Sequence, residues 1–473
     1  VIFRSENGHV SAASNSALGL ATGEYLALMD HDDKLAMHAL LFMVEAINQN
    51  PSAQILYSDE DKINEQGDRL DPHFKPDWNP DLFFSQNYIS HLCIYRRELI
   101  QNAGGFRIGV EGSQDQDLLL RCISQVRHTE ILHVPKVLYH WRMVQGSTAL
   151  AAAEKAYTSE AGIKALTDFF TSQGQDVNVE AGLLPNTYRV RYPMPQSEPL
   201  VSLLIPTRDT LEMLEPCIRS ILEKTTYQNY EIVILDNEST QPATLDYFEY
   251  IKNLDSRVNV LAYRYPFNYS AINNYGVRYA KGEVIGLVNN DTEIINPEWL
   301  TEMVSHALRP EIGCVGAKLY YENETIQHAG VIIGIGGVAG HSHKNFHRTA
   351  PGYFSRLKIV QNLSAVTGAC LVIRKCIYEQ VGGLDEAELR IAFNDVDFCL
   401  KVRQAGYRNL WTPYAELYHY ESQSRGAEDT PEKQARFRGE VEFIKTKWGE
   451  VLRNDPFYSR NLTLTREDFS IRA

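Results

Sequence analysis

The chain has 473 residues with 60 acidic and 46 basic side chains, which give a formal net charge of −14. That length is enough for two or three domains, each with a substantial core. The negative charge argues against a nucleic-acid binder, which needs a basic surface, although a bound nucleotide diphosphate would still need local cations. The seven cysteines form no C-x-x-C pair, so we expect reduced core thiols and a cytoplasmic protein.

No apolar run approaches the roughly 20 residues that span a bilayer, so no transmembrane segment is predicted. Peripheral contact with the inner face of the cytoplasmic membrane stays open. The sequence begins with Val1 rather than Met and shows no signal-peptide pattern. We therefore expect a fragment of a longer chain, in which an upstream anchor is also left open.

The first predicted elements surround a strand that ends in acidic residues. The stretch TGEYLALMDHDDK at 22–34 contains an apolar strand that runs into Asp30, His31, Asp32 and Asp33. A strand and a helix are predicted before it, and a helix, a strand and an acidic turn after it. We interpret the turn as a solvated loop. These elements cover residues 1–3, 11–20, 35–48, 55–57 and 58–62.

The next stretch combines an irregular segment with a second acidic pair. Residues 71–79 (DPHFKPDWN) carry two aromatic residues and two prolines, and form either a loop that lines a sugar or acceptor site or a lid packed on its own domain. Asp115 and Asp117 open a helix that follows a Gly-Gly turn. The strands and helices predicted here cover residues 91–95, 97–103, 118–124 and 131–142.

A second unit follows a proline-rich linker. An Ala-rich helix at 151–172 and an extended pair at 177–192 precede the linker PMPQSEP. Polar residues, Pro206-Thr207-Arg208-Asp209 and then Asp236-Asn237, follow two predicted strands that a helix connects. This arrangement is half of a doubly wound nucleotide site. The strand, helix and strand cover residues 200–205, 211–224 and 231–235.

A second polar strand end lies in KGEVIGLVNNDTE at 281–293. The apolar run at 284–288 stops at Asn289, Asn290 and Asp291, so oxygen ligands are expected at the carboxyl end of a buried strand, where open α/β sheets place their ligands. A carboxylate with two amide carbonyls suits a hard divalent cation that also takes phosphate oxygens. Taken alone, the pattern is more typical of a strand followed by an Asn-rich turn.

This stretch occurs twice, and the repeat defines the domains. Asp32 precedes Asp291 by 259 residues, and Asp115 precedes Asp395 by 280. Polar residues that recur in order are hard to explain by core packing, so we predict two versions of one α/β domain. The first version lacks a counterpart of residues 198–259. The expected divisions are a truncated domain at 1–150, a helical and extended linker at 151–197, and a complete domain at 198–473.

Three further patterns bear on the chemistry. Asn394-Asp395-Val396-Asp397 precedes an amphipathic helix, where the acids serve either as ordinary helix-starting residues or as a base that takes a proton from a hydroxyl. Leu138-Tyr139-His140 recurs as Leu417-Tyr418-His419, and together with Asp291 the second histidine is a candidate metal ligand. Residues 330–352 carry three histidines, which we interpret as a mobile, cationic lid in preference to a zinc site.

Five motifs thus follow one another in a fixed order: Ile205-Pro206-Thr207, Leu235-Asp236-Asn237, Asn289-Asn290-Asp291, Asn394-Asp395-Val396-Asp397 and Leu417-Tyr418-His419. The set resembles the inverting family-2 glycosyltransferases of the GT-A fold, especially the bacterial tandem enzymes of O-antigen and rhamnan synthesis, over nearly the whole chain. The resemblance implies two GT-A-type, Rossmann-like α/β domains in tandem. It also implies a nucleotide-diphosphate sugar donor, a glycan or lipid-linked glycan acceptor, and Mg²⁺ or Mn²⁺ on the diphosphate.

The resemblance implies roles for individual residues as well. Asp395 would be the catalytic base, and Asp115 its counterpart in the first copy. The cation would be held by Asp291, His419, Asp30, Asp32 and His140. The donor and its diphosphate would contact Pro206, Thr207, Asp209, Asp236, Asn237, Asn289, Asn290 and Arg425.

Two departures from the family pattern affect these roles. The second copy has Asn289-Asn290-Asp291 where two carboxylates are usual, which should weaken metal binding, and Asn394 replaces a Glu. The first copy has the fuller acid set but not the nucleotide half. We expect an inverting enzyme that moves a sugar, rhamnose or another deoxyhexose or hexose, to a hydroxyl of a growing surface polysaccharide. The alternative is a non-catalytic glycan-binding or scaffold module on the same fold.

Overall fold

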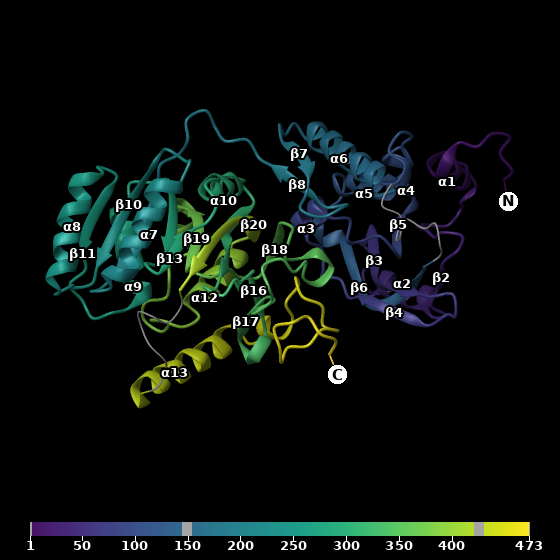
Figure 1. Cartoon of the computed structure of the whole chain (residues 1–473). Coiled ribbons are helices and arrows are strands. Elements are labelled where there is room, and N and C mark those ends of the chain that lie inside the picture. The colour runs from purple at the N-terminus through teal and green to yellow at the C-terminus, as the bar shows by residue number, and fades with distance from the viewer. Residues whose placement is uncertain (1, 144–153, 421–429, 473) are drawn as a thin grey trace. The chain divides into compact units, whose positions relative to one another are not determined.

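The computed structural model describes residues 2–143, 154–420 and 430–472 (Figure 1). These residues form two compact units. The first comprises Val1–Tyr192 and Pro456–Leu462, and the second comprises Pro193–Asp455 and Thr463–Ala473. The boundary therefore falls where the proline-rich segment begins, and a short segment near the end of the chain belongs to the first unit.

The second unit is built on a 10-stranded sheet with the order β11-β10-β9-β12-β19-β14-β20-β13, to which β15 and β18 are added beside β14 and β20. Strands β11, β10, β9 and β12 run parallel. Their apolar runs are buried, as expected for a parallel sheet that is covered on both faces. The strands are β9 (Val201–Thr207), β10 (Tyr230–Asp236), β11 (Val258–Ala262), β12 (Val284–Val288), β13 (Thr292–Ile294), β14 (Ile312–Tyr320), β15 (Ile326–His328), β18 (Gln361–Leu363), β19 (Cys370–Arg374) and β20 (Arg408–His419).

Amphipathic helices connect these strands. In the first of them, Leu214, Cys217, Ile218 and Ile221 recur at helical spacing and are buried in the same core as Ile205 of β9. Figure 1 shows α7 and β10 of this strand-helix-strand unit in teal. The helices of the unit are α7 (Leu211–Lys224), α8 (Pro242–Leu254), α9 (Tyr269–Tyr279), α10 (Trp299–Ala307), α11 (Lys375–Gln380), α12 (Asn394–Gln404) and α13 (Pro431–Trp448).

The first unit has a smaller sheet with the order β1-β5-β3-β6-β2, and β4 pairs with β3. A separate two-stranded sheet, β7 (Asn178–Ala181) with β8 (Tyr188–Arg191), belongs to the same unit. The main strands are β1 (Tyr25–Ala27), β2 (Lys34–Leu35), β3 (Ile55–Ile63), β4 (Arg69–His73), β5 (Cys93–Arg96) and β6 (Ile131–Arg142). The helices are α1 (His9–Leu20), α2 (Ala39–Gln49), α3 (Pro80–Ser85), α4 (Arg97–Asn102), α5 (Gln114–Ile123) and α6 (Glu154–Ser172).

The two sheets repeat one arrangement. The series β1-β5-β3-β6-β2 matches β12-β19-β14-β20-β13 in order, and each corresponding pair of strands has the same direction. One polar contact also recurs: the Asn15 amide exchanges hydrogen bonds with both backbone groups of Phe106, and the Asn274 amide does the same with Leu384. The repeat detected in the sequence is thus a repeat of structure.

The units differ at the edge of the sheet. In the second unit β9 and β10 continue the sheet beyond β12, whereas β1 is the last strand on that side of the first unit, as far as the described residues show. The strand predicted at residues 1–3 is wrong, because residues 2–8 form no strand. A strand needs a hydrogen-bonded neighbour, and no counterpart of β9 or β10 is present among the described residues to provide one.

The acidic turn predicted at 58–62 is also wrong, because these residues form the second half of β3. Asp59, Glu60 and Asp61 are all buried. Glu60 lies 3.2 Å from the Nζ atom of Lys75, a side chain with no exposed surface. Each acid on this strand has a cationic or imidazole partner elsewhere in the first unit. Paired carboxylates of this kind tolerate burial, which composition alone does not reveal.

The segment at 330–352, which was predicted to be a mobile lid with cationic character, includes a packed hairpin. It contains β16 (Val331–Ile333) and β17 (Ala339–His341), which pair antiparallel. His343 is fully buried and stacks on Phe469 with ring centroids 4.2 Å apart. Burial, together with the nearby charge of Arg356, lowers the pKa of His343 to about 3, so this histidine is a neutral core residue.

The buried pair of Glu60 and Lys75 gives a first testable prediction. Glu60→Gln should lower the free energy of unfolding of the first unit by about 3–5 kcal/mol at pH 7, because it leaves Lys75 buried without a counter-ion. The measurement is urea unfolding, with Asp71→Asn as control, since Asp71 pairs with Lys62 at the surface and should contribute less than about 1 kcal/mol.

The pH dependence of the same pair has a defined sign. Burial acts to raise the pKa of Glu60, but Lys75 and the neighbouring histidines outweigh it and lower the pKa to about 2. The stabilisation is therefore fully present above the unfolded value of about 4.5 and is lost as the pH falls toward 2. The difference in the free energy of unfolding between the wild type and Glu60→Gln should therefore decrease as the pH falls from about 4.5 toward 2. A difference that stays constant down to pH 2 would contradict the assignment.

Candidate active site

The ends of β9 and β12 lie side by side in the second unit. Asn290 donates its amide protons to the hydroxyls of Thr207 and Thr210, at 3.0 and 2.8 Å. Pro206 is partly buried beside them. The bonds fix the polar residues that follow two parallel strands at one edge of the sheet, which is the place where doubly wound folds bind ligands.

The end of β10 adds two polar residues to this edge. Asn237 donates to the backbone carbonyls of Tyr263 and Tyr265, while its Oδ1 atom is buried and accepts no hydrogen bond from the described residues. Asp236 accepts the backbone N–H of Ser239 at 2.9 Å. An oriented, buried acceptor of this kind is unfavourable unless a donor group satisfies it.

Asp209 has a different position from its neighbours. Its carboxylate accepts the backbone N–H groups of Thr240 and Gln241, at 2.7 and 2.8 Å, just before α8. Burial acts to raise the pKa of Asp209, but these hydrogen bonds outweigh it and lower the pKa. The side chain therefore clamps the loop after β9 to the start of α8.

Asp291 and His419 meet at the ends of β12 and β20. The Asp291 Oδ1 and His419 Nε2 atoms are 3.2 Å apart, and both side chains are buried. The amide nitrogen of Asn289 lies 3.2 Å from the same Nε2 atom. Two ligands of an octahedral ion with bonds of about 2.1 Å are about 3 Å apart, so the pair has the spacing of adjacent ligands on one divalent cation.

Asp395 lines a cavity of about 380 Å³ that also includes Asn289 and His341. Its Oδ2 atom accepts the backbone N–H of Gly368 at 3.0 Å. The hydroxyl of Tyr269 lies 2.9 Å from the Gly368 carbonyl and 3.2 Å from Asn289 Oδ1. Asn289 thus connects the cavity that holds Asp395 with the pair formed by Asp291 and His419.

Asp397 points away from the cavity. It is completely buried, with the Trp448 indole N–H at 2.7 Å and the Lys447 Nζ atom at 2.8 Å from its Oδ1, and Lys401 on its other oxygen. The structure therefore separates the two acids at the start of α12. Asp397 holds α13 in place, and Asp395 is the acid that a ligand in the cavity can reach.

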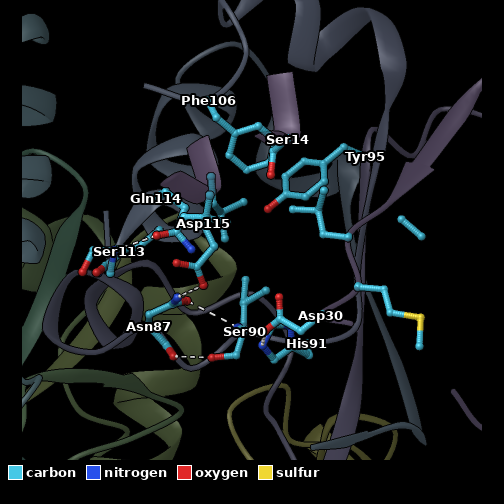
Figure 2. A pocket seen from close by; sticks show the side chains of 18 of the residues that line it. Ser14, Asp30, Asn87, Ser90, His91, Tyr95, Phe106, Ser113, Gln114 and Asp115 are labelled. Atoms are coloured by element: carbon cyan, nitrogen blue, oxygen red, sulfur yellow. Dashed lines mark hydrogen bonds and ion pairs between the residues drawn. The ribbon is translucent and has the colours of Figure 1, made fainter. Parts of the chain in front are cut away.

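The first unit repeats this separation around a larger cavity of about 830 Å³. Asp115 lines that cavity and accepts a hydrogen bond from Asn87 at 2.8 Å (Figure 2). Asp117 is buried between Arg107 and Arg121, at 2.6 and 2.7 Å. Different partners in the two units therefore produce the same division between an accessible and a buried acid.

Three possible ligand atoms come together beside the same cavity, and two of their residues, Asp30 and His91, line it. Those of Asp30, Asp33 and His91 lie within 4.8 Å of one another, the one such group with three or more ligands among the described residues. Figure 2 shows Asp30 beside His91 on the wall that faces Asp115 and Asn87. Burial raises the pKa of Asp33, against the effect of the Arg142 backbone N–H and the Tyr139 hydroxyl.

Two residues predicted as ligands lie outside this group. Asp32 lines the cavity but its nearest ionic neighbour is His31, at 3.7 Å. His140 places its Nδ1 atom 2.5 Å from Asp61. The cause is a shift in register. His419 pairs with Thr292, whereas His140 pairs with Lys34, one position beyond the counterpart of Thr292, and a shift of one residue turns a side chain to the opposite face of a sheet.

Sequence reasoning missed His91, Asp33 and Tyr269. His91 and Tyr269 lie outside the motifs named above, and His91 falls where a plain strand is expected, whereas Asp33 lies in the repeated stretch at 22–34 but was given no role. Asp33 is adjacent to the predicted ligand Asp32, and this position in the sequence could have identified it as a candidate ligand. Arg425, predicted to contact the diphosphate, lies outside the described residues.

The family assignment follows from sequence comparison. The model of the family described as glycosyl transferase family 2 matches residues 1–104 and 202–382, more than half of the chain. The chain therefore belongs to glycosyl transferase family 2, and its fold is that of two GT-A-type α/β domains in tandem. None of the helices described is long and apolar enough to cross a membrane.

Two relatives align with the whole chain. The uncharacterized protein y4gI of Sinorhizobium fredii is 53% identical, with 52% of its own length covered. The O-antigen biosynthesis protein RfbC of Myxococcus xanthus is 36% identical, with 36% of its length covered. The chain thus spans about half or less of these relatives. A mannosyltransferase of Pyrobaculum calidifontis, solved with GDP-Man and Mn²⁺, is 15% identical with a TM-score of 0.40, covering 55% of this chain and 70% of that one.

The division between the two acids of α12 can be tested by stability alone. Asp397→Asn should lower the free energy of unfolding of the second unit by about 2–4 kcal/mol, because it removes the counter-ion of Lys447 in a buried site. Asp395→Asn is the matched control and should change stability by less than about 1 kcal/mol, since Asn serves about as well as Asp at a helix start. Equal losses in the two variants, measured by urea unfolding, would contradict the separation.

Proposed function

We propose that the second unit transfers a sugar from a nucleotide-diphosphate donor to a hydroxyl of a growing surface polysaccharide, with inversion at the anomeric carbon. Membership of glycosyl transferase family 2 supports sugar transfer, and the relative named for O-antigen biosynthesis supports a polysaccharide acceptor. The observation that carries the proposal is the position of Asp395, which faces a cavity while its neighbour Asp397 is buried in ion pairs.

The nucleotide would bind at the ends of β9 and β10. Pro206, Thr207 and Asn290 form one side of this edge, and Asp236 and Asn237 the other. The buried Oδ1 atom of Asn237 would accept a hydrogen bond from the base or ribose of the donor. Asp209 would contribute indirectly, because it holds the loop after β9 against the backbone that precedes α8.

Asp291 and His419 fit a Mg²⁺ or Mn²⁺ ion, because a carboxylate oxygen and an imidazole nitrogen lie at the spacing of adjacent ligands. When bound there, the ion would supply positive charge to the diphosphate that leaves the sugar. The amide nitrogen of Asn289 lies 3.2 Å from the same Nε2 atom of His419, so the ion would replace this contact. Arg425, which lies outside the described residues, is proposed as a further cation for the diphosphate.

Asp395 would be the general base. Its carboxylate would take the proton of an acceptor hydroxyl as that oxygen bonds to the anomeric carbon and the bond from this carbon to the phosphate oxygen breaks. The bond from the Gly368 N–H holds one carboxylate oxygen and leaves the group on the cavity wall. Attack from the face opposite the leaving group inverts the configuration.

We propose corresponding roles for groups of the first unit, in which the described residues include no counterpart of β9 and β10 to hold a nucleotide. Asp115 would be the base, and Asp30 would hold the cation with Asp33 and His91, which stand nearer to it than the originally predicted Asp32 and His140. Asp115, Asp30 and His91 line one cavity.

The role of Asp395 gives the decisive kinetic prediction. Asp395→Asn should reduce turnover by roughly 10² or more, because an amide cannot take the proton. The melting temperature should hardly change. The measurement is release of nucleotide from a panel of nucleotide sugars with Mn²⁺ and a glycan acceptor. Full activity in this variant would exclude Asp395 as the base, and a chain inactive with every donor would favour a glycan-binding role.

The role of Asp291 is tested by binding. In the wild type, Mn²⁺ should raise the affinity for UDP, dTDP or GDP by about tenfold or more, and Asp291→Ala should abolish this increase, since it removes the carboxylate of the ligand pair. Calorimetry with and without Mn²⁺ measures the effect. Asp246→Ala, an exposed acid on α8, is the control. A metal-dependent increase that survives in Asp291→Ala would refute the assignment.

A further inference from the structure

Each cavity receives an aromatic side chain from a helix that the proposed chemistry does not use. In the second unit α13 follows β20 and contributes Phe437, and in the first unit α6 follows β6 and contributes Tyr157. The two rings are 39% and 48% exposed. Large exposed aromatic side chains on a cavity wall favour a ligand that covers them.

In the second unit the ring of Phe437 has an aromatic neighbour. The centroids of Phe437 and Phe393 are 5.7 Å apart, with planes inclined by 37°. Phe393 lies two residues before Asp395 and has a φ of +59°, a conformation that an aromatic residue rarely adopts. Backbone strain of this kind persists where the surrounding structure enforces it, often at functional sites.

A buried carboxylate of α13 enforces that conformation. Glu440 is 2% exposed and accepts the backbone N–H groups of Ile391 and Ala392, at 2.9 and 3.3 Å, directly before Phe393. One helix therefore supplies the exposed ring and also holds the backbone that carries the second ring. The two rings have a fixed position relative to the carboxylate of Asp395.

The first unit reaches the same placement with other residues. A side chain at Gly112, which has a φ of +90°, would begin 2.6 Å from the ring of Tyr157, so the glycine makes room for the ring three residues before Asp115. The position that corresponds to Phe393 is Ser113, whose hydroxyl donates to the carbonyl of Thr158 on α6. Both units thus place an aromatic side chain next to the accessible acid, although the residues that form this contact differ between the units.

We infer that Phe437 with Phe393, and Tyr157 in the first unit, form a platform for a pyranose ring of the glycan acceptor. This inference rests on the proposed function. A pyranose has a face of C–H groups and a rim of hydroxyls, and the cavity of the second unit offers aromatic faces together with Asp395 and Asn289. The acceptor and not the donor is expected there, because the rings adjoin the acid that activates a hydroxyl, whereas the cation ligands lie at the strand ends.

Saturation-transfer difference NMR on the intact chain tests the platform without a donor. The aromatic protons of the protein are irradiated in the presence of the methyl glycosides of rhamnose, glucose, galactose and mannose. Ring C–H protons of at least one glycoside should receive saturation. Phe437→Ala and Tyr157→Ala should each reduce it, and the double variant should reduce it by about fivefold or more, because both aromatic faces are lost. Tyr250→Ala, which removes a 59% exposed ring on α8, should leave it unchanged.

Any of three results would overturn the platform. The wild type transfers no saturation to any glycoside, the double variant retains the wild-type signal, or Tyr250→Ala reduces the signal as much as the double variant does. If the alanine variants lower the melting temperature, Phe437→Leu and Tyr157→Leu preserve apolar volume without a ring and should still lose the signal. The nucleotide-release assay is independent of this measurement. Transfer without saturation would contradict the platform alone, and saturation without transfer would contradict the enzymatic role and retain the platform.

Discussion

In each candidate site, the orientation of the first turn of one helix decides which of its two acids a ligand can reach. Successive residues of a helix differ by about 100°, so two acids two positions apart point about 200° away from each other. When the second acid is buried against cations, the first must face outward. In α12 the partners of Asp397 are Lys447 and Trp448, and in α5 the partners of Asp117 are Arg107 and Arg121. The buried ion pair therefore orients the accessible carboxylate.

This constraint makes α13 part of the site, although it contains none of the five motifs. Its Trp448 and Lys447 hold Asp397, and its Glu440 holds the two backbone N–H groups that precede Phe393. Both contacts are buried and charge-assisted, and contacts of that kind fix geometry more strongly than exposed ones. The start of α12 is thus held from two sides by one helix, which leaves little freedom in the position of Asp395.

The parts of this molecule that the sequence predicts well are those set by local pattern. The predicted bounds of α7 and β12 agree with the structure, because helical spacing and an unbroken apolar run are unambiguous there. The burial of the acids of β3 was not predicted, because their partners, such as Lys75, lie in other parts of the chain. The position of His140 beside Asp61 was not predicted for a related reason: a one-residue shift in register leaves no trace in the sequence.

The two units differ in how their cation ligands are arranged. In the second unit the Asn289 amide lies within hydrogen-bonding distance of His419 Nε2, so a cation must compete with this contact and gains the charge of a single carboxylate from the pair. In the first unit two carboxylates accompany His91, and its Nε2 atom is 3.8 Å from Asp30, beyond a hydrogen bond. Because cation affinity rises with the number of charged ligands, we expect the proposed ligands of the first unit to bind a cation more strongly than the pair of the second unit. The second unit has the nucleotide edge, where the diphosphate itself would supply the missing negative charge.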